Sequence, residues 1–120
     1  MPRTVAVIGA SPHRHKFGNK AFRAFLRQGY TVFAINPNEA EVEGHATYPT
    51  VLDVPERIDM ATVYVQPDQG VKVIEQLAQK RVPEIWLNPG ADSPAVVARA
   101  REFGVHVIRA CSILAIGERP

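Results

Sequence analysis

One stretch near the N-terminus constrains the fold more than any other: an almost wholly apolar strand that runs directly into a glycine-containing loop. Residues 4–8 read Thr-Val-Ala-Val-Ile, and Gly9-Ala10-Ser11 follow without a break. A strand without polar alternation is typical of the centre of a parallel sheet that is covered on both faces. The loop ends near Gly18, and apolar residues then recur at helical spacing over residues 19–28. Since phosphate-bearing ligands bind at strand-to-helix turns of parallel sheets, this loop predicts a nucleotide site.

The same alternation of strands and helices continues along the chain. Further strands are predicted at residues 31–35, 61–65, 84–87 and 105–108, with helices at 68–80 and 94–103 and a short last helix at 112–117. Asp68 and Ser93 are predicted as N-caps, and Thr50 and Asp53 have capping-box spacing at one short helical turn. The remainder of residues 39–58 shows no regular pattern.

Strands that alternate with helices at this spacing favour right-handed crossovers and a doubly wound α/β fold. We therefore predict a single Rossmann-like domain over residues 1–120, with a parallel five-stranded sheet in the order 3-2-1-4-5. Its topological switch point is expected between the carboxyl ends of the strands at residues 4–8 and 84–87. The motifs that end the first four strands are expected to gather on that one rim.

Composition excludes several classes of protein. The chain has 120 residues, of which 46% are hydrophobic, and this suits one domain with a sizeable core. The formal net charge of +2 is too small for a general nucleic-acid or membrane-surface binder. A single cysteine, Cys111, excludes an internal disulfide, and no apolar run reaches the about 18 residues of a membrane helix. We expect a cytoplasmic protein that binds neither nucleic acid nor membrane.

The loop departs from the known phosphate-binding motifs in an informative way. A dinucleotide fingerprint has three glycines, and its three positions here hold Gly9, Ser11 and Arg14. The second strand ends in Asn36-Pro37, where NAD sites place an acidic residue against the ribose hydroxyls. Arg14 and Lys16 add positive charge to the loop. These features favour a ligand with an additional phosphate, and both NADP and coenzyme A have one.

Residues that follow the predicted strands are candidates for ligand contact, because the carboxyl ends of parallel strands share one rim. From the residues alone these candidates are Gly9, Ser11, Arg14, Lys16, Gly18, Gln66, Pro67, Asn88 and Gly90. No Ser-His-Asp order or pair of carboxylates stands out, so no catalytic residue is predicted. His13 and His15 have no carboxylate or cysteine at ligand spacing, so no metal site is predicted.

Several short motifs follow one another in a recognisable order. They are Val7-Ile8-Gly9-Ala10-Ser11, Gly29-Tyr30-Thr31-Val32 before Asn36-Pro37, Tyr48-Pro49-Thr50-Val51 with Asp53-Val54-Pro55, Val63-Tyr64-Val65-Gln66-Pro67, Trp86-Leu87-Asn88-Pro89-Gly90, and Cys111. On these motifs the chain resembles the small stand-alone CoA-binding proteins of bacteria and archaea over nearly its whole length. It resembles the CoA-binding domain of the succinyl-CoA synthetase alpha subunit more distantly.

The resemblance implies that coenzyme A lies across the rim. Its pyrophosphate would sit by Gly9, Ala10 and Ser11, with Lys16 or Arg14 against the phosphates. Asn36 and Pro37 would flank the adenosine end, and the wall would be lined by Tyr64, Val65, Gln66 and Pro67. The chain departs from the family pattern at Asn88, Ser93-Pro94-Ala95 and Arg109-Ala110, which affects the pantetheine end more than the phosphate end.

The function that this resemblance implies is non-catalytic binding of coenzyme A or an acyl-CoA. The protein would serve as a sensor, a carrier or a subunit of an acyl-CoA ligase, and it could form a homo-oligomer. An NAD(P)-binding module or small oxidoreductase is the alternative function. Cys111 has two interpretations, a small buried hydrophobe or a thiol that faces the thiol of coenzyme A.

Overall fold

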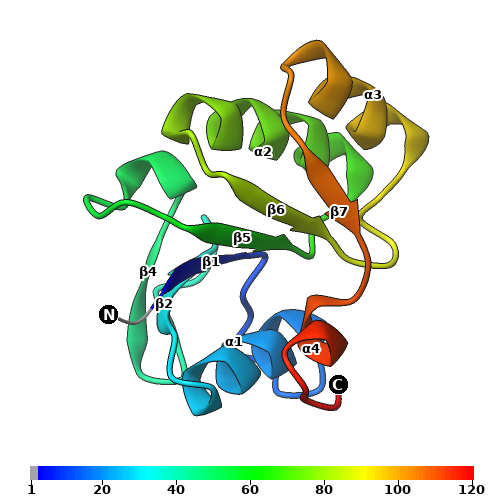
Figure 1. Ribbon diagram of the computed structural model, residues 1–120. Helices are drawn as coiled ribbons and strands as arrows, with labels where there is room; N and C mark the ends of the chain where they lie inside the picture. The colour runs from blue at the N-terminus through cyan, green and yellow to red at the C-terminus, as the bar shows by residue number, and fades with distance from the viewer. Residues whose placement is uncertain (1–2) are drawn as a thin grey trace.

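The apolar strand near the N-terminus lies inside a mixed sheet with helices on both faces (Figure 1). The computed structural model describes residues 3–120. In the figure, α2 and α3 cover one face of the sheet, and α1 and α4 lie against the other. The elements are β1 (Thr4–Ile8), α1 (Phe17–Arg27), β2 (Thr31–Ile35), β3 (Glu41–Val42), β4 (His45–Tyr48), the 3-10 helix η1 (Val51–Asp53), β5 (Met60–Val63), α2 (Pro67–Lys80), β6 (Glu84–Leu87), α3 (Pro94–Glu102), β7 (Val107–Arg109) and α4 (Ser112–Ala115).

The two core clusters explain why β1 shows no polar alternation. Ala6 and Ile8 pack into the cluster on the α2 side of the sheet. Val5 and Val7 pack into the cluster around α1. Both faces of the strand are therefore buried, as the sequence predicts for a central parallel strand.

The sheet has seven strands in the order β3-β4-β2-β1-β5-β6-β7, so the prediction of five strands in the order 3-2-1-4-5 is wrong. The error arises in the segment at residues 39–58, which contains β3 and β4. The strand β4 pairs in parallel with β2 and takes the place predicted for the strand at residues 61–65. That strand, β5, instead pairs with β1 on its other side. In the sequence His-Ala-Thr-Tyr of β4, two residues are exposed and two are half-buried, and this is why the strand carries no apolar pattern.

Counted without the short antiparallel β3, the parallel strands have the dinucleotide-binding order 3-2-1-4-5-6. The switch point lies between β1 and β5, and not between the strands at residues 4–8 and 84–87 as predicted. The carboxyl ends of β1, β2, β5 and β6 still share one rim, since the four strands are parallel neighbours.

Two of the predicted helix caps are confirmed and one is wrong. The Ser93 side chain accepts a hydrogen bond from the Val96 N–H at the start of α3, and Thr50 with Asp53 forms a capping box. Asp68 does not cap α2, because the helix begins at Pro67 and Asp68 lies in its first turn. No helix within residues 3–120 combines the length and the apolar character that crossing a membrane requires.

Candidate functional site

A cleft of about 760 Å³ lies at the carboxyl ends of the central strands. The loop after β1 forms one side, and the segments that follow β2, β5 and β6 form the others. The lining residues are Gly9, Ser11, His13, His15, Lys16, Phe17, Gly18, Asn36, Asn38, Glu39, Tyr64, Val65, Gln66, Pro89, Gly90 and Ala91. The cleft thus brings together most of the residues that are predicted from the sequence to contact a ligand.

Two glycines allow the loop after β1 to lie close to its neighbours. Gly9 has a φ of +91°, and a Cβ atom there would lie 2.9 Å from the Tyr64 carbonyl oxygen. A Cβ atom on Gly18 would lie only 2.1 Å from the Gly9 carbonyl oxygen. Gly18 therefore does what the third glycine of a dinucleotide fingerprint does, which is to let the helix pack closely on the loop.

A buried asparagine, which the sequence analysis did not nominate, supports the same loop. Asn19 is fully buried, and its Nδ2 donates to the Ser11 carbonyl oxygen at 2.8 Å and to Glu43 Oε2 at 3.1 Å. Its Oδ1 accepts from Arg23 Nε at 2.7 Å, and Arg23 also donates to the Arg14 carbonyl oxygen at 3.1 Å. The only signal in the sequence is a polar residue on the otherwise apolar face of the helix.

Asn36 ties the end of β2 to the loop. Its Nδ2 donates to the Ala10 carbonyl oxygen at 2.7 Å, and its Oδ1 accepts from the Asn38 N–H at 2.8 Å. In the loop itself, Ser11 Oγ accepts from the His13 N–H at 3.1 Å. These contacts give the loop a defined shape next to the position where an NAD site would carry its acidic residue.

The acidic and basic side chains that line the cleft are one lysine, two histidines and one glutamate. Lys16 lines the cleft together with His13 and His15, whose ring centroids are 6.1 Å apart. Glu39 is the acidic residue among those that line the cleft. Arg14 lies outside it, and its guanidinium is 3.7 Å from the Glu43 carboxylate. Of the two basic residues predicted to contact phosphate, Lys16 lines the cleft, whereas Arg14 lies beside Glu43, which is in the turn between β3 and β4.

Asn88 is placed differently from the sequence expectation of ligand contact. It is 2% exposed, and its Nδ2 donates to Thr62 Oγ1 at 2.6 Å and to the Val63 carbonyl oxygen at 3.1 Å. Its Oδ1 accepts from the Ser112 N–H at 2.9 Å. Asn88 therefore holds the end of β6 in position, and its neighbours Pro89 and Gly90 line the cleft.

The remaining nominated residues also lie on or near the rim. Ala10 is buried in the core cluster around α1, and Pro67 is the first residue of α2. Pro37 lines a second, adjoining cavity instead of the cleft. The structure thus brings Pro37 close to the rim without placing it in the main cleft.

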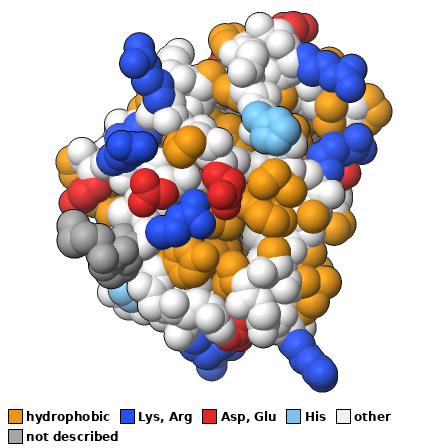
Figure 2. Space-filling view, viewed as in Figure 1, with side chains coloured by type: hydrophobic (Ala, Val, Ile, Leu, Met, Phe, Trp, Pro, Cys, Tyr) orange, Lys and Arg blue, Asp and Glu red, His pale blue; other side chains and the backbone are white. Residues whose placement is uncertain are grey.

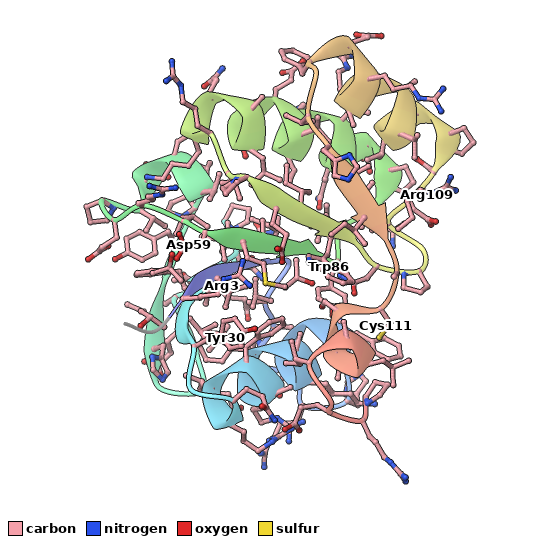
Figure 3. All side chains as sticks on the ribbon, viewed as in Figure 1. Arg3, Tyr30, Asp59, Trp86, Arg109 and Cys111 are labelled. Carbon is pink, nitrogen blue, oxygen red and sulfur yellow. The ribbon has the colours of Figure 1, made fainter. Side chains whose placement is uncertain are left out.

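Tyr64 is half-buried, and it contributes a wall of the cleft and a hydroxyl that forms a hydrogen bond. The phenol oxygen is 3.2 Å from Ser112 Oγ, which is 2.7 Å from Thr62 Oγ1. Burial raises the pKa of the Tyr64 phenol, so the side chain is neutral at physiological pH. The half-buried, free thiol of Cys111 lies just before α4 and is not among the lining residues of the cleft (Figure 3).

The second cavity measures about 310 Å³ and adjoins the cleft. Gly9, Asn36, Asn38 and Val65 line both hollows, so the two form one continuous depression. Acidic and basic side chains are interspersed on the face shown in Figure 2, and no dense basic stripe is visible there. Within residues 3–120, no three His, Cys, Asp or Glu side chains are grouped so that they could hold a metal ion.

Comparisons with known proteins agree on one family. The family model described as "CoA binding domain" matches residues 3–117. The ADP-forming acetate–CoA ligase I of Archaeoglobus fulgidus is 40% identical over 81 residues, which are 68% of this chain and 12% of the ligase. Subunit alpha of the ADP-forming acetate–CoA ligase I of Pyrococcus furiosus is 32% identical over 123 residues, covering 89% of this chain and 27% of the subunit.

The solved structures lead to the same fold. A structure titled as a hypothetical protein from Pyrococcus horikoshii OT3 has a TM-score of 0.85 and 29% identity, and covers 92% of this chain and 78% of that one. The chain spans only 12% and 27% of the length of the two ligase relatives described above. The shared part is therefore one domain of those larger proteins.

Proposed function

This chain belongs to the CoA binding domain family, and on that premise we propose that it binds coenzyme A or an acyl-CoA across the cleft. The observation that carries the proposal is the continuous depression formed by the cleft and the second cavity at the topological switch point. In open α/β sheets ligands bind at this place. The two hollows, of about 760 and 310 Å³, give an elongated ligand two connected compartments.

The pyrophosphate is proposed to lie against the loop after β1. The first N–H groups of α1 have no acceptor within the helix, and the helix dipole favours an anion there. The first turn of α1 contains no acidic residue, and Lys16 lines the cleft beside it. Ser11 and Gly9 allow the ligand to approach the backbone closely, since neither carries a large side chain.

The adenosine end is proposed to lie toward Asn36 and Pro37, where the cleft opens into the second cavity. The wall formed by Tyr64, Val65 and Gln66 then faces the middle of the ligand. This assignment leaves the pantetheine arm to run toward Gly90 and Ala91. The ligand would contact the segments that follow β1, β2, β5 and β6.

The proposed role is binding without catalysis by this chain itself. Its relatives are ADP-forming acetate–CoA ligases, and in Pyrococcus furiosus the matching segment belongs to a subunit named alpha. We propose that this chain supplies the CoA-binding part of a ligase assembly, or acts as a sensor or carrier of CoA. Association with further copies of itself is compatible with each of these roles.

One observation favours a second candidate, an NAD(P)-binding module. Glu39 is half-buried and lines the cleft just beyond the end of β2. A carboxylate near this place could accept hydrogen bonds from ribose hydroxyls. The strand order of the sheet is also that of dinucleotide-binding domains.

Thermal unfolding with each ligand separates the two functions. A ligand that binds the native state at 100 times its Kd stabilises it by about 2.7 kcal/mol, which for a domain of this size raises the Tm by roughly 10 °C. We expect this rise with coenzyme A and no comparable rise with NADH or NADPH. A clear rise with NADPH and none with millimolar coenzyme A would favour the second candidate and overturn the first.

A further inference from the structure

A lysine on α2, Lys72, gives the second cavity a positive charge of its own. The walls of this cavity are largely apolar and come from Ile8, Ile35, Pro37, Val65 and Val73. Its polar lining includes Gln69, Lys72 and Gln76, which are three and four residues apart and so lie on one face of α2. An apolar slot edged by amides and one cation is suited to a flat heterocycle that carries an anionic group.

The charge of Lys72 is not neutralised by a close partner. Among the described residues that line the second cavity, Lys72 is the one with a charged side chain. On the same helix, Glu75 is engaged by Arg99 at 2.7 Å, and Asp68 lies one turn earlier in the first turn of α2. Within residues 3–120, no ion pair or hydrogen bond joins the Lys72 ammonium to another side chain. The exposed ammonium is available to an anion bound in the cavity.

We propose that the second cavity holds the purine base and that Lys72 binds the phosphate on the adjoining ribose. This inference rests on the proposed function and extends it, because it makes Lys72 a determinant of specificity. Coenzyme A carries a 3′-phosphate on its ribose, whereas NAD and 3′-dephospho-CoA carry hydroxyl groups there. The base would lie between the apolar walls, with the amides of Gln69 and Gln76 at its polar edge.

The residues at the end of β2 are consistent with a preference for a ribose that carries a phosphate. Asn36 stands where an NAD site would carry a carboxylate, and a carboxylate would repel a phosphate on the ribose. The Asn36 amide is engaged with Ala10 and Asn38, so it leaves this part of the rim neutral. A ribose phosphate near Asn36 and Pro37 thus meets a neutral edge on one side and the Lys72 cation on the other.

Calorimetric titration with coenzyme A and 3′-dephospho-CoA tests the inference. We expect the wild-type protein to bind coenzyme A about tenfold more tightly, as a hydrogen bond to a charged partner predicts. Lys72→Gln should bring the two affinities close together by weakening coenzyme A alone. Lys72→Arg keeps the charge and should keep most of the preference.

Arg101→Gln is the matched control. Arg101 is exposed on α3, lines neither hollow, and loses the same single positive charge when substituted. This variant should keep the wild-type preference for coenzyme A. A Tm measurement on each variant verifies that it is folded, which is expected because Lys72 is exposed.

Two results would overturn the inference while leaving the proposed function intact. One is equal binding of both ligands by the wild-type protein. The other is a preference for coenzyme A that survives unchanged in Lys72→Gln. Failure of the wild-type protein to bind either ligand is a different result, because it overturns the proposed function itself.

Discussion

At the scale of single residues, the close approach at Gly18 decides the shape of the candidate site. The first turn of α1 packs on the backbone of Gly9, and a side chain at Gly18 would meet the Gly9 carbonyl oxygen at 2.1 Å. A backbone atom in the middle of a loop cannot move aside as the end of a flexible side chain can. The loop and the helix are therefore one unit, although Gly18 lies nine positions after Gly9 in the sequence.

We expect Gly18→Ala to lower the free energy of unfolding by about 3 kcal/mol or more, because the added methyl group overpacks a site closed by backbone. Gly29→Ala is the matched control. Gly29 has a φ of +87° but no atom within 4 Å of the added Cβ, so its cost should stay near the about 1–2 kcal/mol of left-handed strain. Urea unfolding of both variants provides the comparison, and equal losses would refute the packing argument.

At the scale of secondary-structure elements, Asn88 joins three of them. Its amide connects the end of β6 to Thr62 and Val63 of β5, and it accepts from the N–H of Ser112 in α4. Asn88, Thr62 and Ser112, which supply the other groups besides the Val63 carbonyl, are all buried polar residues. Asn88 thus fixes the rim where Pro89 and Gly90 line the cleft.

Asn88→Ala should cost about 2–3 kcal/mol of unfolding free energy, because it leaves buried polar groups without their partners. Asn38→Ala provides a control, since Asn38 is exposed and lines the cleft without such contacts to its side chain. We expect the control to cost less than about 0.5 kcal/mol. A similar loss in both variants by urea unfolding would contradict the role assigned to Asn88.

Asp59 connects the beginnings of two other elements, β1 and β5 (Figure 3). Its Oδ2 accepts from the Thr4 N–H at 3.0 Å, and the Asp59 N–H donates to Thr4 Oγ1 at 2.9 Å. The hydrogen bonds from Thr4, followed by the charges of Arg57 and Arg3, hold the pKa of Asp59 below its ordinary value. The folded state therefore binds the Asp59 proton more weakly than the unfolded state does.

The lowered pKa of Asp59 predicts that the protein loses stability in acid. The contribution of Asp59 is fully present above the pKa of the unfolded state, about 3.9, and is lost as pH falls through the lower folded pKa. Asp59→Asn should therefore show a smaller drop in unfolding free energy between pH 7 and about pH 3 than the wild-type protein. Parallel pH dependences of the two proteins in urea unfolding would show that Asp59 does not contribute.

At the scale of the whole molecule, the sequence predicts the α/β class and the rim, but not the order of the strands. Apolar runs identify β1, β2 and β6, because nearly all of their residues are buried or half-buried. The strand β4, which lies between β2 and the edge strand β3, carries His-Ala-Thr-Tyr. Its residues are exposed or half-buried, so it lacks the apolar pattern that would have placed it next to β2. One missed strand changes the predicted neighbours of β1 and with them the position of the switch point.

The candidate site could be predicted only in part, because the sequence indicates which residues follow a strand but not where their side chains point. A glycine or a basic residue after a strand indicates the rim, and Gly9, Lys16 and Gly18 line the cleft accordingly. The direction in which a side chain points cannot be predicted from its place after a strand. Asn88 is therefore predicted to contact the ligand, although its side chain is buried in the structure. Asn19 was missed because its role depends on Ser11 and Glu43, which only the folded chain brings to it.

Titration of coenzyme A into Ser11→Glu and Ser11→Gln tests the central claim most directly. Ser11 is 6% exposed and lines the cleft where the pyrophosphate is proposed to lie. The two replacements have nearly the same size, so they differ in charge alone, and only the glutamate repels a phosphate. We expect binding of coenzyme A to the wild-type protein, weaker binding to Ser11→Gln, and a further loss of at least about tenfold in Ser11→Glu. Equal binding of coenzyme A by the two variants would contradict the proposed site.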